Sequence, residues 1–292
     1  MSDKINIFGI GVSGLVGSRI IELLKDDYII DNFSLDTGVD ITNPNTLDVI
    51  TQDKEHDVVL LLAAKADVDG CERDKDQGTT GAAYKINVEG AQNVVNACRD
   101  TGKKIIYVST DFVFDGEGTP EGGYTEEDAP HPINWYAKTK HMAEEIVKNS
   151  GSPFIIIRLA YPYQDKEFAL KKDFVHAIIG RLKSNQSVAA VTDHIMTPTF
   201  LDDFAMCIDA LIKSKQTGIF HAVGSQALSP FDAAMLIAKR FGLDSSLITK
   251  TTRAEYFKDR AARPFNLSMN NAKIKQLGVK MKTFEEGLEF VK

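Results

Sequence analysis

The chain has 292 residues, 43% of them hydrophobic, so it is long enough to bury one large core or two smaller ones. Its 34 Lys and Arg residues against 41 Asp and Glu residues give a net charge of −7. This balance argues against nucleic acid or an anionic membrane as a partner, because both attract basic surfaces. The sequence shows no signal-peptide pattern and no apolar run of roughly 20 residues, so we expect a cytoplasmic protein that does not span a membrane.

Short apolar runs alternate with helix-period segments through the first half of the chain. Strands are expected at 5–8, 28–30, 58–64 and 105–108, with helices at 15–24 and 86–98. Continuous apolar strands separated by amphipathic helices are typical of a parallel sheet covered on both faces. The pattern predicts a doubly wound, Rossmann-like α/β domain.

A glycine-rich segment joins the first strand to the first helix. Gly11, Gly14 and Gly17 have the spacing that gives a tight turn and lets the backbone approach a pyrophosphate. The free N–H groups at the start of the helix, around Ser13 and Leu15, would then face the phosphates. A purely structural turn is the alternative, but the strand before it and the helix after it favour dinucleotide binding.

Asp31 follows the second predicted strand, twenty residues after Gly11. A carboxylate at this place can accept hydrogen bonds from the adenosine ribose and repels a 2′-phosphate. No Lys or Arg lies between Lys25 and Lys54, so NAD(H) is favoured, with NADP(H) left open. A simple turn cap is the alternative role for Asp31.

Other cofactor contacts are expected from loops at the same edge of the sheet. Asp40 and Ile41 could border the adenine. Ala63 and Ala64 end what is expected to be the fourth strand, where small side chains let ribose and phosphates pass closely. Ordinary packing is an equal alternative for each of these residues. The remaining predicted cofactor contacts are Lys65, Asn87 and Ser109.

The strand at 105–108 runs into Ser109-Thr110-Asp111, and Tyr136 and Lys140 follow in a Tyr-x-x-x-Lys spacing. A helix predicted over 136–149 places Tyr136 and Lys140 on one face, so the cation can act on the hydroxyl. A nearby cation lowers the pKa of a phenol from about 10, which would make Tyr136 a usable acid. A solvated helix face is the alternative for a single match, but the preceding Ser-Thr-Asp favours catalysis.

The second half of the chain is expected to form a smaller lobe at 161–292, after a cofactor domain at 1–160. Strands at 154–157 and 218–223 are expected to join the main sheet, so the two parts interleave. Other expected elements are helices at 174–182, 201–211 and 230–241, a strand at 188–191, and a last helix with Thr283 and Glu286 as its capping box.

Cysteine and histidine spacing indicates no metal site. Cys71, Cys98 and Cys207 are far apart and have no second Cys or His at metal-ligand spacing, so reduced structural thiols are expected. None of the six histidines has a Cys or Asp arrangement resembling a nucleophilic triad.

Several motifs occur in one order over nearly half of the chain: Gly11/Gly14/Gly17, Asp31-Asn32-Phe33-Ser34, Ala63-Ala64, Asn87, Ser109-Thr110-Asp111 and Tyr136/Lys140. This order resembles the extended short-chain dehydrogenase/reductase superfamily. Within that superfamily, residues 109–116 and 262–264 are similar to the dTDP-4-dehydrorhamnose reductase family, and the similarity extends over essentially the whole chain.

The resemblance implies NAD(P)H-dependent reduction of the C4 ketone of a nucleotide-linked 4-keto-6-deoxy sugar. Tyr136 would protonate the forming alkoxide, and Thr110 would donate a hydrogen bond to it. Lys140 would hold the nicotinamide ribose. The implied partner is therefore a small nucleotide-sugar substrate, and a homodimer is left open.

Residues on the substrate side depart from the family pattern. Phe112 stands where the family has Tyr, Tyr161 takes the place of a Trp that lines the sugar pocket, and Ala262 replaces the first Arg of an Arg-Arg-Pro. The resemblance implies that Asp111 also contacts the substrate and that Arg263 meets a substrate phosphate.

Two other classes of function stay open. A dehydratase would require a second acid after Asp111, where Phe112 stands, but an epimerase uses the same Tyr and Lys with tightly held NAD. The methionine adenosyltransferase regulatory subunit keeps the Ser-Thr-Asp and Tyr-x-x-x-Lys elements. A non-catalytic, cofactor-binding subunit is therefore the alternative to an enzyme.

Overall fold

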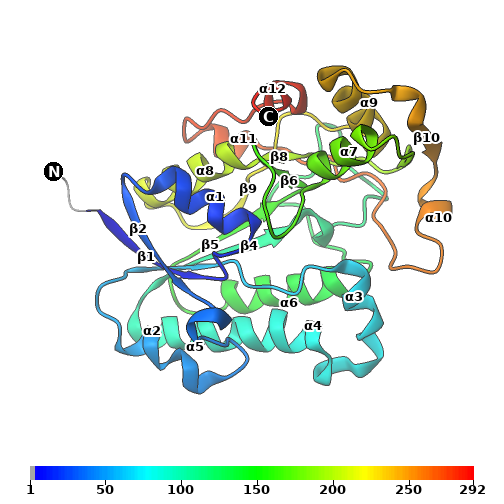
Figure 1. Ribbon diagram of the computed structural model, residues 1–292. Helices are drawn as coiled ribbons and strands as arrows, with labels where there is room; N and C mark the ends of the chain where they lie inside the picture. Colours follow the sequence, from blue (N-terminus) through cyan, green and yellow to red (C-terminus); the bar gives the residue numbers. More distant parts are fainter. Residues whose placement is uncertain (1–3) are drawn as a thin grey trace.

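Six parallel strands form the central sheet of the computed structural model, which describes residues 4–292 (Figure 1). Their order across the sheet is β2-β1-β3-β4-β5-β9. The bounds are β1 Ile5–Ile10, β2 Tyr28–Phe33, β3 Val58–Leu61, β4 Lys104–Thr110, β5 Phe154–Leu159 and β9 Gly218–His221. The sheet confirms the α/β fold predicted from the sequence.

Helices cover both faces of the sheet (Figure 1). On one face α1 (Leu15–Leu24) packs against α8 (Leu201–Lys213). The other face carries α2 (Asp48–Gln52), α5 (Gly90–Thr101) and α6 (Trp135–Lys148). Successive side chains of a strand point to opposite faces, so Ile7 enters one core and Phe8 the other, and neither is exposed. Burial on both faces explains why these strands are continuous apolar runs.

The segment between β2 and β3 differs from the prediction. Ala63 and Ala64 follow the third strand, β3, and not a fourth one. The intervening chain forms α2 and two 3₁₀ turns, Leu35–Thr37 and Pro44–Leu47. Its polar residues make local turn bonds that compete with strand pairing, such as that from Asn45 N to the Asn43 side chain. The next strand along the chain, β3, pairs with β1 on the side opposite to β2. The strand order reverses at this point, and doubly wound folds bind ligands at such a reversal.

The helix predicted over 86–98 is longer and irregular. It begins as α4 (Ala82–Tyr84), continues through a π turn at Lys85–Glu89, and ends with α5. Gly102 closes α5 in the left-handed conformation, with φ of +71°. Before it lie α3 (Val68–Arg73) and a 3₁₀ stretch at Lys75–Thr80.

The chain after residue 161 was predicted to form a smaller lobe, and β9 from this part pairs with β5 of the main sheet. Two short parallel pairs form within the lobe: β6 (Pro162–Tyr163) with β8 (Thr199–Phe200), and β7 (Val188–Val191) with β10 (Ile248–Thr251). Its helices are α7 Phe174–Lys183, α9 Pro230–Phe241, α10 Arg253–Tyr256, α11 Ala272–Lys275 and α12 Phe284–Leu288. The predicted capping box of Thr283 and Glu286 is present at α12. The division into two domains near residue 160 stays a prediction, and residues 1–3 lie outside the described chain.

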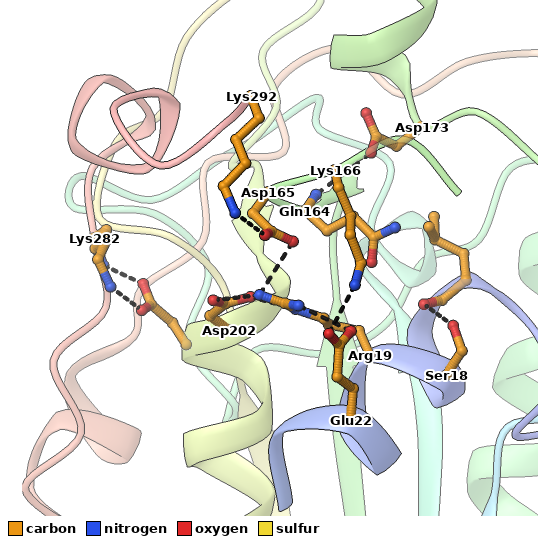
Figure 2. A network of polar contacts seen from close by, with 12 residues as sticks. Ser18, Arg19, Glu22, Gln164, Asp165, Lys166, Asp173, Asp202, Lys282 and Lys292 are labelled. Carbon is orange, nitrogen blue, oxygen red and sulfur yellow. Dashed lines mark hydrogen bonds and ion pairs between the residues drawn. The ribbon is translucent and has the colours of Figure 1, made fainter. Parts of the chain in front are cut away.

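A cluster of ion pairs joins α1 to α8 and to Asp165, which follows β6 (Figure 2). The Arg19 side chain, only 7% exposed, donates to both carboxylate oxygens of Asp202 at 2.7 Å. Its Nη2 also lies 3.1 Å from Asp165, which Lys292 approaches at 3.4 Å. Losing one member of such a buried pair leaves an uncompensated charge, so the cluster fixes α1 against α8. Within residues 4–292, no helix is both long and apolar enough to cross a bilayer.

Candidate active site

The glycine turn lies between β1 and α1 and touches the end of β3. Gly11 has φ of +74°, and a Cβ there would stand 2.6 Å from Ala63 N. A Cβ on Gly17 would collide with the backbone of Val12, so this glycine lets α1 pack on the turn. Ser13 lies in the turn, and Ala64 follows Ala63.

The start of α1 fits a dinucleotide pyrophosphate. Leu15 is its first residue, its N-cap Gly14 has no side chain to cap the free N–H groups, and its first turn carries no acidic residue. These N–H groups and the positive end of the helix dipole favour a bound anion. The glycine turn supplies the space for a close backbone approach.

Asn87 holds the loop after β3 in place. Its side-chain oxygen accepts from Lys65 N at 2.8 Å, and its side-chain nitrogen donates to Lys65 O at 3.1 Å. The same nitrogen donates to Thr139 Oγ1 at 3.0 Å, which ties the loop to α6 between the predicted catalytic positions. The Lys65 ammonium lies 3.4 Å from Asp74. The structure thus places Lys65 and Asn87 beside the glycine turn, at the edge where a cofactor was predicted.

Asp31 lies within β2, two residues before its end at Phe33, and not beyond the strand as predicted. Its Oδ2 is 2.9 Å from His56 Nε2, and His56 Nδ1 is 2.8 Å from Asp53. Burial raises the pKa of Asp53, but bonds from Lys103 and His56 outweigh this and lower it to about 2. The Asp31 carboxylate is 52% exposed and pairs with His56. Its contact with a ribose stays a prediction.

Asp40 and Ile41 serve local structure. Asp40 Oδ1 accepts from Thr42 N at 2.9 Å and from Thr42 Oγ1 at 2.8 Å, which closes a turn. Ile41 is buried, and its carbonyl accepts from Asn93 at 2.9 Å. A contact of either residue with an adenine stays a prediction.

The end of β4 brings the three predicted catalytic residues together. Lys140, on α6, is 3% exposed and donates to Val108 O at 2.8 Å. Tyr136 lies on the same helix one turn before Lys140, and Thr110 is near enough to influence the pKa of its hydroxyl. Ser109 is buried between Val108 and Thr110 on the same strand. Carboxyl ends of parallel strands are the usual place for such groups.

The structure contradicts the prediction that Lys140 lowers the pKa of Tyr136. Burial raises the pKa of Tyr136, and the charge of Asp111 adds to the rise while Thr110 opposes it. Burial also lowers the pKa of Lys140 to about 7, against the influence of Glu144. Desolvation disfavours the charged form of each group, the tyrosinate and the ammonium. Its strength cannot be read from the spacing of two residues in a sequence.

Asp111 is a buried carboxyl next to these groups, 2% exposed. Its Oδ1 accepts from Thr110 Oγ1, while Oδ2 has no hydrogen-bond partner among the described residues. Burial raises the pKa of Asp111 to about 7, although the Thr110 bond opposes the rise. The site therefore contains a carboxyl that gains or loses a proton near neutral pH.

A cavity of about 440 Å³ lies between α7, β7 and α10, and Thr110, Tyr136 and Lys140 do not line it. Tyr161 lines it, and the Tyr161 ring centroid is 6.4 Å from that of Phe112. Phe112 in turn lies edge-on to Tyr136, with centroids 6.1 Å apart. The chain of three rings connects the cavity wall to the predicted acid. Other residues lining the cavity include Phe174, Arg181, His194, Met196, Tyr256 and Phe257.

Arg263 does not line this cavity, but its guanidinium lies 4.5 Å from the ring centroid of Phe257, which does. Its Nη2 donates to Asp69 Oδ1 at 2.9 Å. Arg260 donates to Asp69 Oδ2 through two nitrogens, at 2.9 and 2.6 Å. Asp69, on α3, escaped the sequence analysis because nothing local marks a contact nearly two hundred residues away. A meeting of Arg263 with a substrate phosphate stays a prediction.

A buried ion pair supports α6 below Lys140. Arg158 on β5 donates to both oxygens of Glu144, at 3.1 and 2.8 Å, and the two side chains are 1% and 2% exposed. Arg158 Nη1 also lies 3.3 Å from His221 Nε2. Glu144 follows Lys140 by one helical turn, a spacing visible in the sequence, but its partner on β5 is not. Among residues 4–292, no three His, Cys, Asp or Glu side chains gather in a way that could hold a metal.

Comparisons with known proteins agree with this geometry. A probable low-salt glycan biosynthesis reductase of Haloferax volcanii is 29% identical, over 96% of this chain and 95% of its own length. The crystal structure of dTDP-4-dehydrorhamnose reductase from Bacillus anthracis, in complex with NADP, has a TM-score of 0.87 at 30% identity and covers 98% of both chains. The beta subunit of methionine adenosyltransferase 2 from Pongo abelii is 29% identical, over 84% of this chain and 72% of that protein.

The profile of the RmlD substrate-binding domain matches residues 5–291, nearly the whole chain. The fold agrees with this match, because the central parallel sheet is shared with the dTDP-4-dehydrorhamnose reductase structure. The chain therefore belongs to the RmlD substrate-binding domain family, within the extended short-chain dehydrogenase/reductase superfamily.

Proposed function

We propose that the protein reduces the C4 ketone of a nucleotide-linked 4-keto-6-deoxy sugar with a nicotinamide cofactor. The observation that carries this proposal is the meeting of Thr110, Tyr136 and Lys140 at the end of β4, with a cavity of about 440 Å³ beyond the rings of Phe112 and Tyr161. A cavity of this size is in the range of small-molecule sites. The reductases among the relatives support the same class of reaction.

The residues supply the proton and the polar contacts, while a nicotinamide bound at the glycine turn would supply the hydride. Tyr136 donates its phenolic proton to the oxygen that becomes an alkoxide. The raised pKa of Tyr136 keeps the phenol protonated at neutral pH, and an alkoxide is basic enough to take its proton. Thr110 stabilises the same oxygen by a hydrogen bond. Lys140 would hold the nicotinamide ribose in the orientation that hydride transfer needs.

For the cofactor, NAD(H) remains the proposal because of the Asp31 carboxylate and the lack of Lys or Arg between Lys25 and Lys54. The NADP bound to the Bacillus anthracis reductase makes NADP(H) the competing choice. The two are separated by comparing kcat/KM for NADH and NADPH with the same sugar.

The experiment that tests the function follows cofactor absorbance with dTDP-4-dehydrorhamnose and a small panel of other keto-sugar nucleotides. We expect oxidation of NADH or NADPH that depends on the sugar. The Tyr136→Phe variant is the matched control, since it keeps the ring and removes the proton donor. No sugar-dependent oxidation of either cofactor would rule the proposal out.

A non-catalytic subunit is the second candidate, because the methionine adenosyltransferase beta subunit is similar over 84% of this chain. Such a subunit would bind the cofactor without turning over any keto sugar, and would form a stoichiometric complex with a partner enzyme. Size-exclusion chromatography with light scattering detects that complex and also tests whether the protein forms a homodimer. An epimerase would instead purify with bound cofactor, which its absorbance spectrum reveals.

A further inference from the structure

Tyr161, which lines the cavity, has an unusual backbone conformation. Its φ of +40° lies in the left-handed region that residues other than glycine rarely adopt. Its ring is enclosed by other rings, with Phe174 perpendicular at 5.9 Å between centroids and His194 at 5.7 Å. A strained backbone of this kind persists only where the surroundings fix the residue, and such positions cluster at ligand sites.

His194 has only one arrangement of hydrogens that satisfies both of its neighbours. It is 2% exposed, and its Nδ1 lies 2.8 Å from Pro264 O. A carbonyl can only accept, so Nδ1 carries a hydrogen, and Nε2 of the neutral ring is an acceptor. The Tyr161 hydroxyl lies 2.8 Å from Nε2 and must therefore donate to it.

The neutral state of His194 follows from its surroundings. Burial lowers its pKa to about 4, against the Pro264 hydrogen bond, and the charges of Arg253 and Arg263 lower it further while Asp193 opposes them. His194 keeps its acceptor at Nε2 throughout the neutral range. The phenolic hydrogen of Tyr161 is then committed to His194.

We propose that His194 makes Tyr161 an acceptor toward the cavity, so that the site selects a nucleotide sugar presenting a hydroxyl or N–H donor at this point. Tyr161 and His194 both line the cavity, and the hydrogen bond joins these two lining residues. After donating its one hydrogen, the Tyr161 oxygen has only lone pairs to offer a ligand. A ligand carbonyl placed there would meet a lone pair and lose its hydrogen bond. His194 is a positioning residue, and the ligand class rests on the proposed function.

The direction of the hydrogen bond is tested without any ligand. Nitrogen NMR of the histidine-labelled protein at pH 7 is expected to show His194 as the neutral Nδ1–H tautomer. Tyr161→Phe is expected to shift the Nε2 resonance, because it removes the donor. A His194 ring that is charged, or that carries its hydrogen on Nε2, overturns the proposal whatever the protein's activity.

The ligand side is tested by calorimetry with dTDP-glucose as the probe. Tyr161→Phe is expected to weaken binding about 10-fold, the worth of one hydrogen bond in an enclosed site. Tyr163→Phe is the matched control, because Tyr163 donates to Phe284 O and does not line the cavity. The affinity of this variant for dTDP-glucose should equal that of the wild type. His194→Gln, whose amide oxygen can still accept from Tyr161, should bind within about threefold of the wild type.

Each ligand outcome decides the question. Equal affinity of the wild type and Tyr161→Phe overturns the acceptor role, and failure of the wild type to bind dTDP-glucose overturns the ligand class. Failure of the proposed function is a separate result, because it appears as absence of sugar-dependent NADH or NADPH oxidation by the wild type.

Discussion

Thr110 Oγ1 donates its hydrogen to Asp111 Oδ1 over 3.0 Å, so the hydroxyl proposed to assist the substrate oxygen is already engaged by a carboxylate. The same Thr110 oxygen accepts from Phe112 N at 3.2 Å. A hydroxyl has one hydrogen, so Thr110 can donate to a ligand only when Asp111 is protonated and can donate in turn. The protonation state of Asp111 therefore sets the direction of this hydrogen bond.

We expect kcat to fall as the pH rises from 6 to 8.5. Burial raises the pKa of Asp111 to about 7 and lowers that of Lys140 to about 7, so below pH 7 the first is neutral and the second charged. Both forms favour the proposed reaction. The measurement is kcat against pH for the wild type and Asp111→Asn, in which the part of the decline due to Asp111 should disappear. Identical profiles for the two proteins would show that Asp111 does not control Thr110.

Asp111 should also make the folded protein less stable as the pH rises from about 4 to 7. The folded pKa of about 7 exceeds the unfolded value of about 4, so the folded state binds more protons in this window and stability falls with pH. Asp111→Asn lacks this loss. Between pH 4.5 and pH 7.5, its free energy of unfolding should therefore rise by about 1–3 kcal/mol relative to that of the wild type. Urea unfolding of both proteins at the two pH values measures the gain. A constant difference between them would refute the raised pKa.

Tyr136→Phe should lower kcat about 10²–10⁴-fold, because it removes the general acid. The edge-on contact of this ring with Phe112 needs no hydroxyl, so the fold and the affinity for cofactor should stay near those of the wild type. Steady-state kinetics and cofactor fluorescence titration check the two parts. An unchanged kcat would remove Tyr136 from the acid role.

Asp31→Ala should narrow the preference for NADH over NADPH, by roughly threefold to tenfold, since a half-exposed carboxylate is screened by solvent. The reason is the loss of repulsion between the carboxylate and a 2′-phosphate. Titration of both cofactors measures the ratio of affinities. Asp53→Asn is the control, because Asp53 contacts the other side of His56. A ratio that moves in neither variant would exclude Asp31 from the cofactor site.

Arg158→Met should destabilise the protein by about 3–5 kcal/mol, because it leaves the Glu144 carboxylate buried without its partner. The double variant Arg158→Met/Glu144→Leu should recover most of this loss, since no charge is then left unpaired. Chemical unfolding of the wild type, both single variants and the double variant gives the coupling energy. Additive losses would mean that the two residues do not depend on each other.

Local patterns in the sequence were sufficient for the fold and for part of the site. The glycine spacing, the apolar runs and the helix caps act over a few residues, so they correctly placed α1, α9 and the carboxyl end of β4. The Tyr136 and Lys140 spacing likewise put both side chains on one face of α6.

Contacts between distant parts of the chain were not predictable in this way. His56 reaches Asp31 across the sheet, Asp69 binds two arginines of the smaller lobe, and His194 orients Tyr161. The burial that raises the pKa of Tyr136 comes from packing against a cluster that includes Ala160, Val223 and Leu267, which are distant from it in the sequence. Periodicity identifies which face of an element is buried, but not what lies opposite it.

The Arg19 cluster bears on how the protein can be fused or tagged. Lys292 donates to Asp165 O through its backbone nitrogen at 2.8 Å, and Asp165 faces Arg19 on the helix behind the glycine turn. A fusion or tag that replaces Lys292 would remove both of its contacts with Asp165 and loosen the junction that holds this helix. A design that retains Lys292 keeps both contacts.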